Sequence, residues 1–457
     1  MSSLLSLFPF QQEGVTHLLQ RWNVLLADEM GLGKTVQAAT AMSRLIAANA
    51  IRRILIVCPA SLCRNWRREI HQWAPGVPVV LYEGSDRYGM LEGDITVLVG
   101  SYETVAGDLR RATRDGQSWY DIGVDLIILD EAQRIKDPNS LKSKVLSKIT
   151  APRRWAISGT PLENHPRDLA SILRFLFPNE FDTDESLDDA LQIFALRDRS
   201  MVRRSKSQVG AQLPSKTVSY VPLAMSPEQS SEYERKCTEI KEAVCGAKSL
   251  SAASAALLGG LQKLRRIAVL SLDGESVKLD YLVDEIENAT AQDEKIVVFS
   301  SFAHLVLPSV AKRLSSFGAL LYTGEMSATE REIVHQRFLN DSDARVMCAS
   351  LKAAGVGLTW TVASYVYQLD LWWNPQVLRQ AEDRVHRIGQ KRPVLVKRLV
   401  SEGTIEDGIR DLLVTKEDIF DLVITERSDK SGDPRYLTQL LSLIDLKISD
   451  LKCASEC

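Results

Sequence analysis

The fold is decided by one short stretch, Val24-Leu25-Leu26-Ala27-Asp28-Glu29-Met30-Gly31-Leu32-Gly33-Lys34-Thr35, in which an apolar strand leads into a glycine-rich turn and a helix-compatible segment. Backbone N–H groups of such a turn, together with the helix N-terminus, can cradle phosphates. In this interpretation Lys34 reaches the β- and γ-phosphates, and the Thr35 hydroxyl ligates Mg²⁺. The alternative is a turn without a ligand, because Asp28 stands where the strict pattern has glycine. The predicted nucleotide-binding residues here are Asp28, Glu29, Met30, Gly31, Leu32, Gly33, Lys34 and Thr35.

A pair of acidic residues further along the chain favours the phosphate-binding interpretation of this turn. Asp130 and Glu131 end the apolar run 126–129. A carboxylate at the end of a neighbouring parallel strand can hold Mg²⁺, so we predict Asp130 and Thr35 as the metal ligands. Glu131 can then polarise a water for attack on the γ-phosphate. Acidic residues favoured by a helix dipole are the alternative, which explains either acid alone but not their pairing with the upstream turn. We therefore predict nucleotide hydrolysis, with Lys34 as a third catalytic residue.

The same kind of apolar run recurs along the chain, in two groups. Continuous apolar strands without alternation are expected where helices cover both faces of a parallel sheet. The first group is 24–26, 54–57, 96–99, 126–129 and 155–157, and the second is 296–299, 346–348, 365–367 and 394–396. Two α/β domains fit this rhythm better than one.

A helical segment is expected between the two groups. Ser226 caps a helix with Pro227 at its first position and Gln229 three residues after the cap, and an apolar stripe follows at helical spacing. Gly259 and Gly260 form a plausible break. We predict a first lobe over 1–215, ending in a short helical protrusion, and a helical connector over 216–275. A second lobe over 276–425 and a helical tail over 426–457 complete the chain.

Composition excludes several classes of protein. The 457 residues are too many for one ordinary core, and 45% are apolar. With 56 Lys and Arg against 59 Asp and Glu, the formal charge of −3 excludes a histone-like nucleic-acid binder but not a local basic groove. Seven cysteines without a C-x-x-C pair do not form a secreted disulfide framework. We expect an intracellular protein without a membrane partner. Six scattered histidines favour Mg²⁺ as the only metal, without zinc.

An arginine-rich segment lies in the second group, at 380–390. On a helix, Gln380, Arg384 and Arg387 share one face. The two guanidiniums can then neutralise charge on a transferred phosphoryl group, which makes Arg384 and Arg387 catalytic candidates. The alternative is a solvated helix whose arginines pair with Glu382 and Asp383.

At this point the chain resembles the Swi/Snf-type DNA-dependent ATPases of helicase superfamily two. The resemblance covers about 9–407 and rests on motifs in the family's order. They are Pro9-Phe10-Gln11-Gln12-Glu13-Gly14, the 28–35 stretch, Pro59-Ala60-Ser61-Leu62 with Asn65-Trp66, Ser101-Tyr102-Glu103-Thr104, the Asp130-Glu131-Ala132-Gln133 box, Ser158-Gly159-Thr160, Arg203-Arg204-Ser205-Lys206, Val298-Phe299-Ser300, the run 350–359 and the arginine segment. The fourth box residue is Gln133 instead of His, a variation that the family tolerates.

The resemblance implies two tandem RecA-like lobes, each a parallel sheet flanked by helices, with ATP and Mg²⁺ in the cleft between them. Gln11 matches the family's adenine-contacting residue. Ser158 and Thr160 match the motif that couples the γ-phosphate site to lobe movement. Gly355 matches a second-lobe loop that approaches ATP, and Gln380 belongs to the same nucleotide-binding set.

The resemblance also implies duplex DNA as partner, gripped through its phosphates without base reading. The weaker candidates for these contacts are Ser61, Asn65, Tyr102, Ser300, Ser350 and Lys352. Three basic clusters could add to the groove or be solvated faces: Arg64-Arg67-Arg68, Arg203-Arg204-Lys206 and Arg265-Arg266.

The expected function is an ATP-dependent translocase on double-stranded DNA that displaces or remodels bound proteins. The alternatives are a strand-separating DNA or RNA helicase of the same superfamily and a nucleotide-gated scaffold subunit of a larger defence or repair complex, with protein partners. The compact length favours a cytoplasmic, nucleoid-associated protein of bacterial or viral origin, or a nuclear one in a eukaryote.

Overall fold

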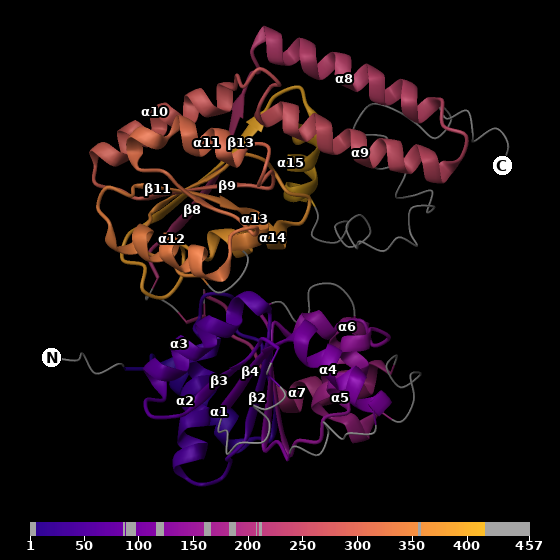
Figure 1. Cartoon of the computed structure of the whole chain (residues 1–457), viewed down its shortest axis with the longest axis vertical. Helices are drawn as coiled ribbons and strands as arrows, with labels where there is room; N and C mark the ends of the chain where they lie inside the picture. Colours follow the sequence, from indigo (N-terminus) through magenta and orange to yellow (C-terminus); the bar gives the residue numbers. More distant parts are fainter. Residues whose placement is uncertain are drawn as a thin grey trace. The chain divides into compact units, whose positions relative to one another are not determined.

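The computed structural model describes residues 6–85, 87, 97–115, 123–159, 166–181, 189–206, 208–209, 213–354 and 358–415. The chain divides into two compact units, Met1–Leu213 and Pro214–Cys457. Each unit contains its own parallel sheet flanked by helices, which confirms the predicted fold class (Figure 1). No helix among the described residues is long and apolar enough to cross a membrane.

The first unit is built on a seven-stranded sheet in the order β3-β4-β2-β5-β6-β1-β7. Its strands are β1 (Asn23–Leu26), β2 (Ile54–Cys58), β3 (Val79–Tyr82), β4 (Val97–Ser101), β5 (Leu126–Asp130), β6 (Arg153–Ile157) and β7 (Met201–Val202). Its helices are α1 (Pro9–Gln20), α2 (Lys34–Ala47), α3 (Cys63–Trp73), α4 (Tyr102–Asp115), α5 (Leu141–Ser147), α6 (Pro166–Leu176) and α7 (Ala190–Ser200).

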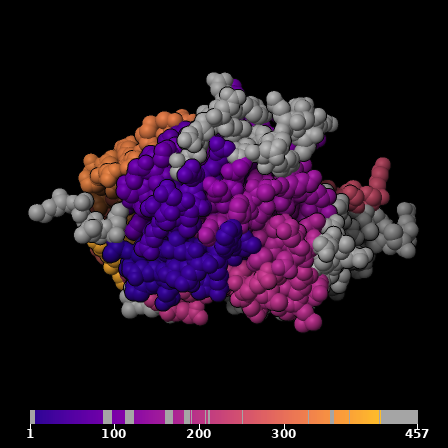
Figure 2. Space-filling view, turned by 90° about the horizontal axis from the view of Figure 1, so that it is seen from below, coloured from indigo at the N-terminus to yellow at the C-terminus, as the bar shows by residue number. Residues whose placement is uncertain are grey.

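Helices cover both faces of this sheet, as its continuous apolar strands require. The helices α4 to α7 bury their apolar residues against one face, and α1, α2 and α3 lie on the other side (Figure 1). Because β1 pairs with β6 and β7, the N-terminal segment adjoins later residues of the unit, as the indigo and magenta surfaces in Figure 2 show.

The second unit has a six-stranded sheet in the order β10-β11-β9-β12-β13-β8. Its strands are β8 (Lys216–Leu223), β9 (Ile296–Ser300), β10 (Leu320–Tyr322), β11 (Val346–Ser350), β12 (Tyr365–Gln368) and β13 (Val394–Ser401). Its helices are α8 (Pro227–Cys245), α9 (Leu250–Val269), α10 (Val277–Ala291), α11 (Leu307–Arg313), α12 (Ala328–Asn340), α13 (Leu351–Ala354), α14 (Pro375–Glu382) and α15 (Ile405–Thr415).

Three apolar clusters hold this unit together. Helices α12, α13 and α14 pack on one face of the sheet, and α10 and α11 pack on the other. The third cluster joins the α8–α9 hairpin to α15 and to residues that follow β12 and end β13. The hairpin is therefore part of the second unit's core.

The segment predicted as a helical connector differs from expectation in two places. Residues 216–223 form β8, an edge strand that pairs along its whole length with β13. In addition, α9 runs without interruption through Gly259 and Gly260, so the predicted break is wrong. The cap of α8 is confirmed, because the Ser226 side chain accepts from the Gln229 N–H. The predicted tail at 426–457 lies outside the described residues.

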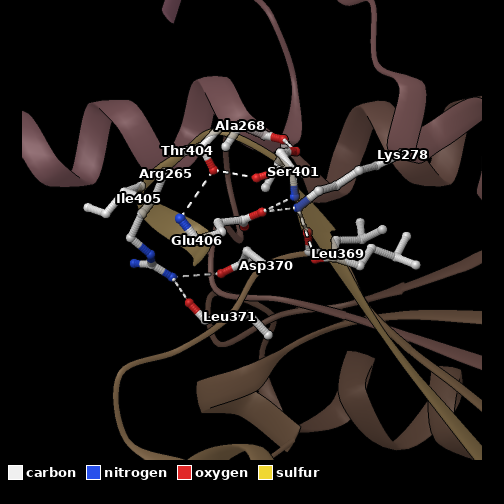
Figure 3. A network of polar contacts seen from close by, with 12 residues as sticks. Arg265, Ala268, Lys278, Leu369, Asp370, Leu371, Ser401, Thr404, Ile405 and Glu406 are labelled. Carbon is white, nitrogen blue, oxygen red and sulfur yellow. Dashed lines mark hydrogen bonds and ion pairs between the residues drawn. The ribbon is translucent and has the colours of Figure 1, made fainter. Parts of the chain in front are cut away.

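Two buried ion pairs fix the hairpin and the neighbouring helices to the sheet (Figure 3). Arg265 of α9 donates to Asp370, which follows β12, over 2.8 Å, and both side chains are fully buried. Lys278 of α10 pairs with Glu406 of α15 and also donates to the Leu369 carbonyl. Buried charges are tolerated only when they are paired and hydrogen-bonded, as these are.

Candidate functional site

The carboxyl ends of three adjacent strands bring the predicted catalytic segments to one edge of the first sheet. In the register of the sheet, Leu26 of β1 lies level with Ile157 of β6, and Ile157 lies level with Asp130 of β5. The glycine-rich turn, Ser158 and the Asp130–Glu131 pair therefore lie side by side, at the same carboxyl edge of the sheet. The structure thus brings together the first-unit residues predicted to bind and hydrolyse a nucleotide.

The glycine-rich turn has the backbone conformation that phosphate cradles use. Gly31 and Gly33 have φ values of 86° and 73°, a region that side chains disfavour, and α2 starts directly after Gly33. The Gln11 carboxamide packs on this turn, since its Nε2 donates to the Leu32 carbonyl over 3.3 Å. A Cβ on Gly33 would lie 2.5 Å from that nitrogen. The turn therefore leaves room for Gln11 only because position 33 is glycine.

Lys34 and Asp28 have different roles in this turn. The Lys34 ammonium donates to the carbonyls of Asp28 and Glu29 over 2.7 and 3.2 Å. The Asp28 carboxylate is fully buried and accepts from Arg204 Nη2 over 2.6 Å and from Gln37 over 3.0 Å. The Asp28 side chain is thus held by an ion pair within the first unit, and its place among the nucleotide-binding residues stays a prediction.

Both oxygens of the Asp130 carboxylate are held in place. Oδ2 accepts from the Trp66 indole N–H over 2.7 Å, and Oδ1 accepts from the Glu131 backbone N–H over 2.9 Å. Burial raises the pKa of Asp130 to about 7, helped by the neighbouring Glu131 charge and opposed by Trp66 and Lys34. A divalent cation would favour the ionised form, and carboxylate and hydroxyl oxygens are the donors that Mg²⁺ prefers. Asp130 and Thr35 thus fit the predicted metal by their chemistry.

Glu131 is oriented by a short relay of side chains. Its backbone is in the left-handed region at φ 53°, which is uncommon for a residue with a side chain. Gln133 Nε2 donates to Glu131 Oε2 over 2.6 Å, and Gln133 Oε1 accepts from the Ser158 hydroxyl over 2.7 Å. The relay links the predicted general base to the segment after β6. Thr160 lies outside the described residues.

The arginine segment of the second unit is not one continuous helix. Gln380 lies in α14, but that helix ends at Glu382, so the predicted shared helical face with Arg384 and Arg387 is wrong. After Glu382 the Arg384 and Val385 N–H groups donate to carbonyls three residues earlier, and the Arg384 carbonyl accepts from the Trp360 N–H over 2.7 Å. Arg384 is buried, and Arg387 donates to the Leu358 carbonyl over 3.1 Å.

Glu382, the alternative partner predicted for these arginines, pairs with two other cations. Glu382 is buried and pairs with Lys216 of β8 and Arg398 of β13, over 2.8 and 2.6 Å. Its pKa lies below the ordinary value because these two cations outweigh the effect of burial, which alone would raise it. Gly355 lies outside the described residues.

Three of the predicted DNA contacts are buried within their own units. Tyr102 is fully buried and donates to the Asp130 carbonyl over 3.0 Å. Ser300 is fully buried and donates to Asp370, and the buried Ser350 hydroxyl accepts from the Ala353 N–H. Contact of these three residues with DNA stays a prediction. Ser61 is exposed and Asn65 is half-buried, so both remain predictions, and the Lys352 side chain is outside the description.

The three basic clusters also separate by burial. Arg64, Arg67 and Arg68 are exposed on α3. Arg204 is instead the partner of Asp28, and its guanidinium lies 5.4 Å from the Phe10 ring centroid. Arg265 is fully buried, so its assignment to a groove or a solvated face is wrong. Of the three clusters, the one on α3 is the one in which every member is exposed.

Four residues make contacts at or around these sites that their sequence motifs do not indicate: Trp66, Gln133, Arg204 and Arg265. Arg204 and Asp28 are separated by 176 positions, so no local pattern signals their contact. Trp66 and Gln133 lie inside quoted motifs, and for Gln133 the signal in the sequence is a polar side chain two positions after Glu131.

Comparison with known proteins gives matches along most of the chain. The SNF2-related domain matches residues 10–269, and the helicase conserved C-terminal domain matches residues 277–389. The first match extends past the structural division at Leu213 and includes the α8–α9 hairpin.

Three curated relatives show the extent of the similarity. An uncharacterized ATP-dependent helicase of Mycoplasma genitalium is 29% identical over 91% of this chain and 42% of its own length. A putative ATP-dependent helicase/translocase of Bacillus subtilis, YwqA, is 30% identical over 92% of this chain and 49% of its own. The ISWI chromatin-remodeling complex ATPase ISW1 of Saccharomyces cerevisiae is 28% identical over 97% and 43%.

The chain thus spans less than half the length of these relatives. The SNF2-related match covers more than half of the chain and includes the glycine-rich turn and the Asp130–Glu131 pair. With the helicase C-terminal match on the second sheet, these findings lead to one conclusion: the chain belongs to the SNF2-related family of helicase-like proteins.

Proposed function

We propose that this protein is a DNA-stimulated ATPase that translocates on double-stranded DNA and displaces or remodels bound proteins. The proposal rests on one observation: the glycine-rich turn and the Asp130–Glu131 pair lie next to each other at the carboxyl edge of the first sheet. That placement supports the proposal, because a phosphate cradle, a cation ligand and a general base for hydrolysis need to lie close together. The printed names of the relatives, an ATP-dependent helicase/translocase and a remodelling ATPase, support the same activity.

The residues of the first unit divide the work of hydrolysis. The N–H groups at the start of α2 and the Lys34 ammonium bind the phosphates, for which Lys34 exchanges its present carbonyl partners. Bound Mg²⁺, held by Thr35 and Asp130, would supply charge neutralisation on the phosphates. Glu131, oriented by Gln133, takes a proton from the attacking water.

The second unit contributes positive charge in this proposal. Arg384 and Arg387 neutralise the charge that develops on the transferred phosphoryl group during turnover. Arg384→Ala or Arg387→Ala then retains nucleotide binding and lowers turnover by roughly 10³-fold if the residue acts as an arginine finger. An arginine variant with full activity would remove that residue from the mechanism.

The decisive experiment measures ATP turnover with duplex DNA, single-stranded DNA, RNA and no nucleic acid. Duplex DNA should give the largest stimulation. Lys34→Ala should lose binding of a fluorescent ATP analogue, whereas Glu131→Gln should bind it and fail to hydrolyse ATP. Turnover that is the same with and without duplex DNA would contradict the proposal.

Two further measurements separate the alternatives. Unwinding of a labelled fork would show a strand-separating helicase instead of a duplex translocase. Displacement of a streptavidin block from biotinylated duplex DNA by wild type, and not by Glu131→Gln, is the expected result. If Glu131→Gln restored the phenotype of cells that lack the protein, hydrolysis would not be required and the protein would act as a nucleotide-gated scaffold.

A further inference from the structure

Helix α3 has two faces with different chemistry. Cys63, Trp66 and Ile70 are buried against the sheet. Arg64, Arg67 and Arg68 are exposed, so the same short helix presents a basic face to solvent. A packed, rigid helix can carry coupling between a ligand on one face and the side chains on the other.

The buried face of α3 reaches the proposed metal ligand directly. Trp66 is fully buried, and its indole N–H donates to Asp130 Oδ2 over 2.7 Å. Hydrogen bonds to an ionised carboxylate are shorter and stronger than neutral ones. This contact sets the direction of one of the two oxygens, while the Glu131 N–H sets that of the other.

A second contact fixes the backbone of the same residue. The hydroxyl of Tyr102, at the start of α4, donates to the Asp130 carbonyl over 3.0 Å. Two motif segments that the resemblance assigns to DNA thus each send one buried aromatic side chain to Asp130. Their polar ends meet the acid, and their rings are excluded from solvent.

A nearby tryptophan shows that this hydrogen bond is not a general consequence of burial. Trp155 of β6 is also fully buried in the same sheet, with Ile128 of β5 as its register partner. Among the described residues, its indole nitrogen has no hydrogen-bond partner. The two buried indoles therefore differ in this hydrogen bond, which makes Trp155 a control for Trp66.

We propose that Trp66 is a positioning residue that transmits the binding of duplex DNA on the basic face of α3 to the Asp130 carboxylate. This inference rests on the proposed ATPase function and names the path of its stimulation. DNA phosphates engage Arg64, Arg67 and Arg68, the helix settles, and the indole N–H holds Asp130 in the orientation that binds the cation.

The experiment compares three variants of the full chain by ATP turnover over a titration of duplex DNA. Trp66→Phe removes the N–H and keeps an aromatic ring, and Trp155→Phe is the matched control for loss of buried indole. Trp66→Phe should lower the maximal DNA-stimulated kcat by about tenfold, with an unchanged DNA concentration at half-maximal stimulation. Trp155→Phe should keep the maximal stimulation of wild type.

The third variant, the triple substitution Arg64→Ala, Arg67→Ala and Arg68→Ala, should show the opposite pattern. It should raise the DNA concentration at half-maximal stimulation by at least about tenfold and retain the maximal rate at saturating DNA. This contrast separates DNA binding from its transmission. Thermal unfolding and binding of a fluorescent ATP analogue, measured in parallel, exclude loss of the fold or of the nucleotide site.

The inference is overturned if Trp66→Phe and Trp155→Phe have the same maximal stimulation, or if Trp66→Phe changes only the DNA concentration that is needed. Should Trp66→Phe fail to fold, β-(3-benzothienyl)alanine at position 66 keeps the shape of indole and lacks only its N–H, and the same outcomes apply. Wild type without any stimulation by DNA contradicts the proposed function itself, whereas stimulation that survives in the position-66 variants contradicts only the role of Trp66.

Discussion

Gln133 is the side chain that connects the proposed general base to the segment after β6. It donates to Glu131 over 2.6 Å and accepts from Ser158 over 2.7 Å. Gln133→Leu keeps the approximate volume and removes both contacts, so Glu131 loses its orientation. We expect kcat to fall by about tenfold with little change in ATP affinity, since a hydrogen bond to a charged group is worth roughly 1.5–3 kcal/mol.

Ser158→Ala provides the matched comparison for Gln133→Leu, because it removes only the outer hydrogen bond of the relay. Its effect on kcat should have the same direction and be smaller. Steady-state ATP turnover with duplex DNA measures both variants. Equal, wild-type rates in both would show that Glu131 is oriented without this relay.

Asp130 gives a pH-dependent stability of known sign. Its pKa is raised from 3.8 to about 7 by burial and by Glu131, so between these values it is ionised in the unfolded chain and protonated in the folded one. Folding then takes up a proton, and the stabilising contribution is complete below the unfolded pKa of 3.8 and is lost as the pH rises through about 7. Asp130→Asn removes this titration.

We therefore expect Asp130→Asn to gain stability relative to wild type as the pH rises from about 5 to about 8, by up to about 1.4 kcal/mol per pH unit below the folded pKa. Urea unfolding without nucleotide and with EDTA measures this difference. A difference that stays constant over the range would mean that Asp130 is ionised in the folded, metal-free protein.

At the scale of elements, Gly260 determines how closely the two helices of the hairpin approach. It is buried in α9, and a Cβ there would lie 2.6 Å from Ile240 Cγ2 of α8. Gly259, one position earlier, is exposed, and a Cβ there meets nothing within 4 Å. The pair of glycines that suggests a break in the sequence thus serves one close contact inside a continuous helix.

Adjacent substitutions should consequently have opposite signs. Gly260→Ala should destabilise the protein by about 1–3 kcal/mol through overpacking, and Gly259→Ala should stabilise it by roughly 0.5–1 kcal/mol through helix propensity. Adding Ile240→Ala to Gly260→Ala should recover part of the loss attributable to the clash, as measured by urea unfolding in a double-mutant cycle. Equal effects of the two alanines would contradict the close packing.

The strands show what sequence could predict and where the pattern fails. All nine predicted apolar runs are strands, and each lies inside its sheet. The four strands without a prediction, β3, β7, β8 and β10, are the four edges of the two sheets. β7 has only two residues, and β8 is exposed or half-buried along its length and contains Pro222, so neither shows the continuous apolar run of a central parallel strand. β3 and β10 are short but continuously apolar, Val79–Tyr82 and Leu320–Tyr322, so the same pattern also fits them.

Some residues of the site could be predicted from local sequence motifs, and others depend on contacts far along the chain. The turn at 28–35 and the Asp130–Glu131 pair are local patterns, and the structure places them together as expected. The assignment of Arg265 to a groove or a solvated face is wrong because its guanidinium meets Asp370, 105 positions along the chain. Burial of a polar side chain depends on such distant partners, which motif spacing does not encode.

At the scale of the whole molecule, the proposed DNA binding has to be local because the formal charge is −3. In this proposal the exposed arginines of α3 contribute to the contact, and each phosphate contact adds about 0.9 to the slope of log affinity against log salt. We expect modest affinity that falls steeply with salt.

Arg67→Ala should reduce the slope of log affinity against log salt by about 1. Arg313→Ala, which removes an exposed arginine paired with Asp280 in the second unit, should leave that slope unchanged. Fluorescence anisotropy with labelled duplex DNA at several salt concentrations measures the slopes, and tight binding that salt hardly weakens would contradict a local, phosphate-directed contact.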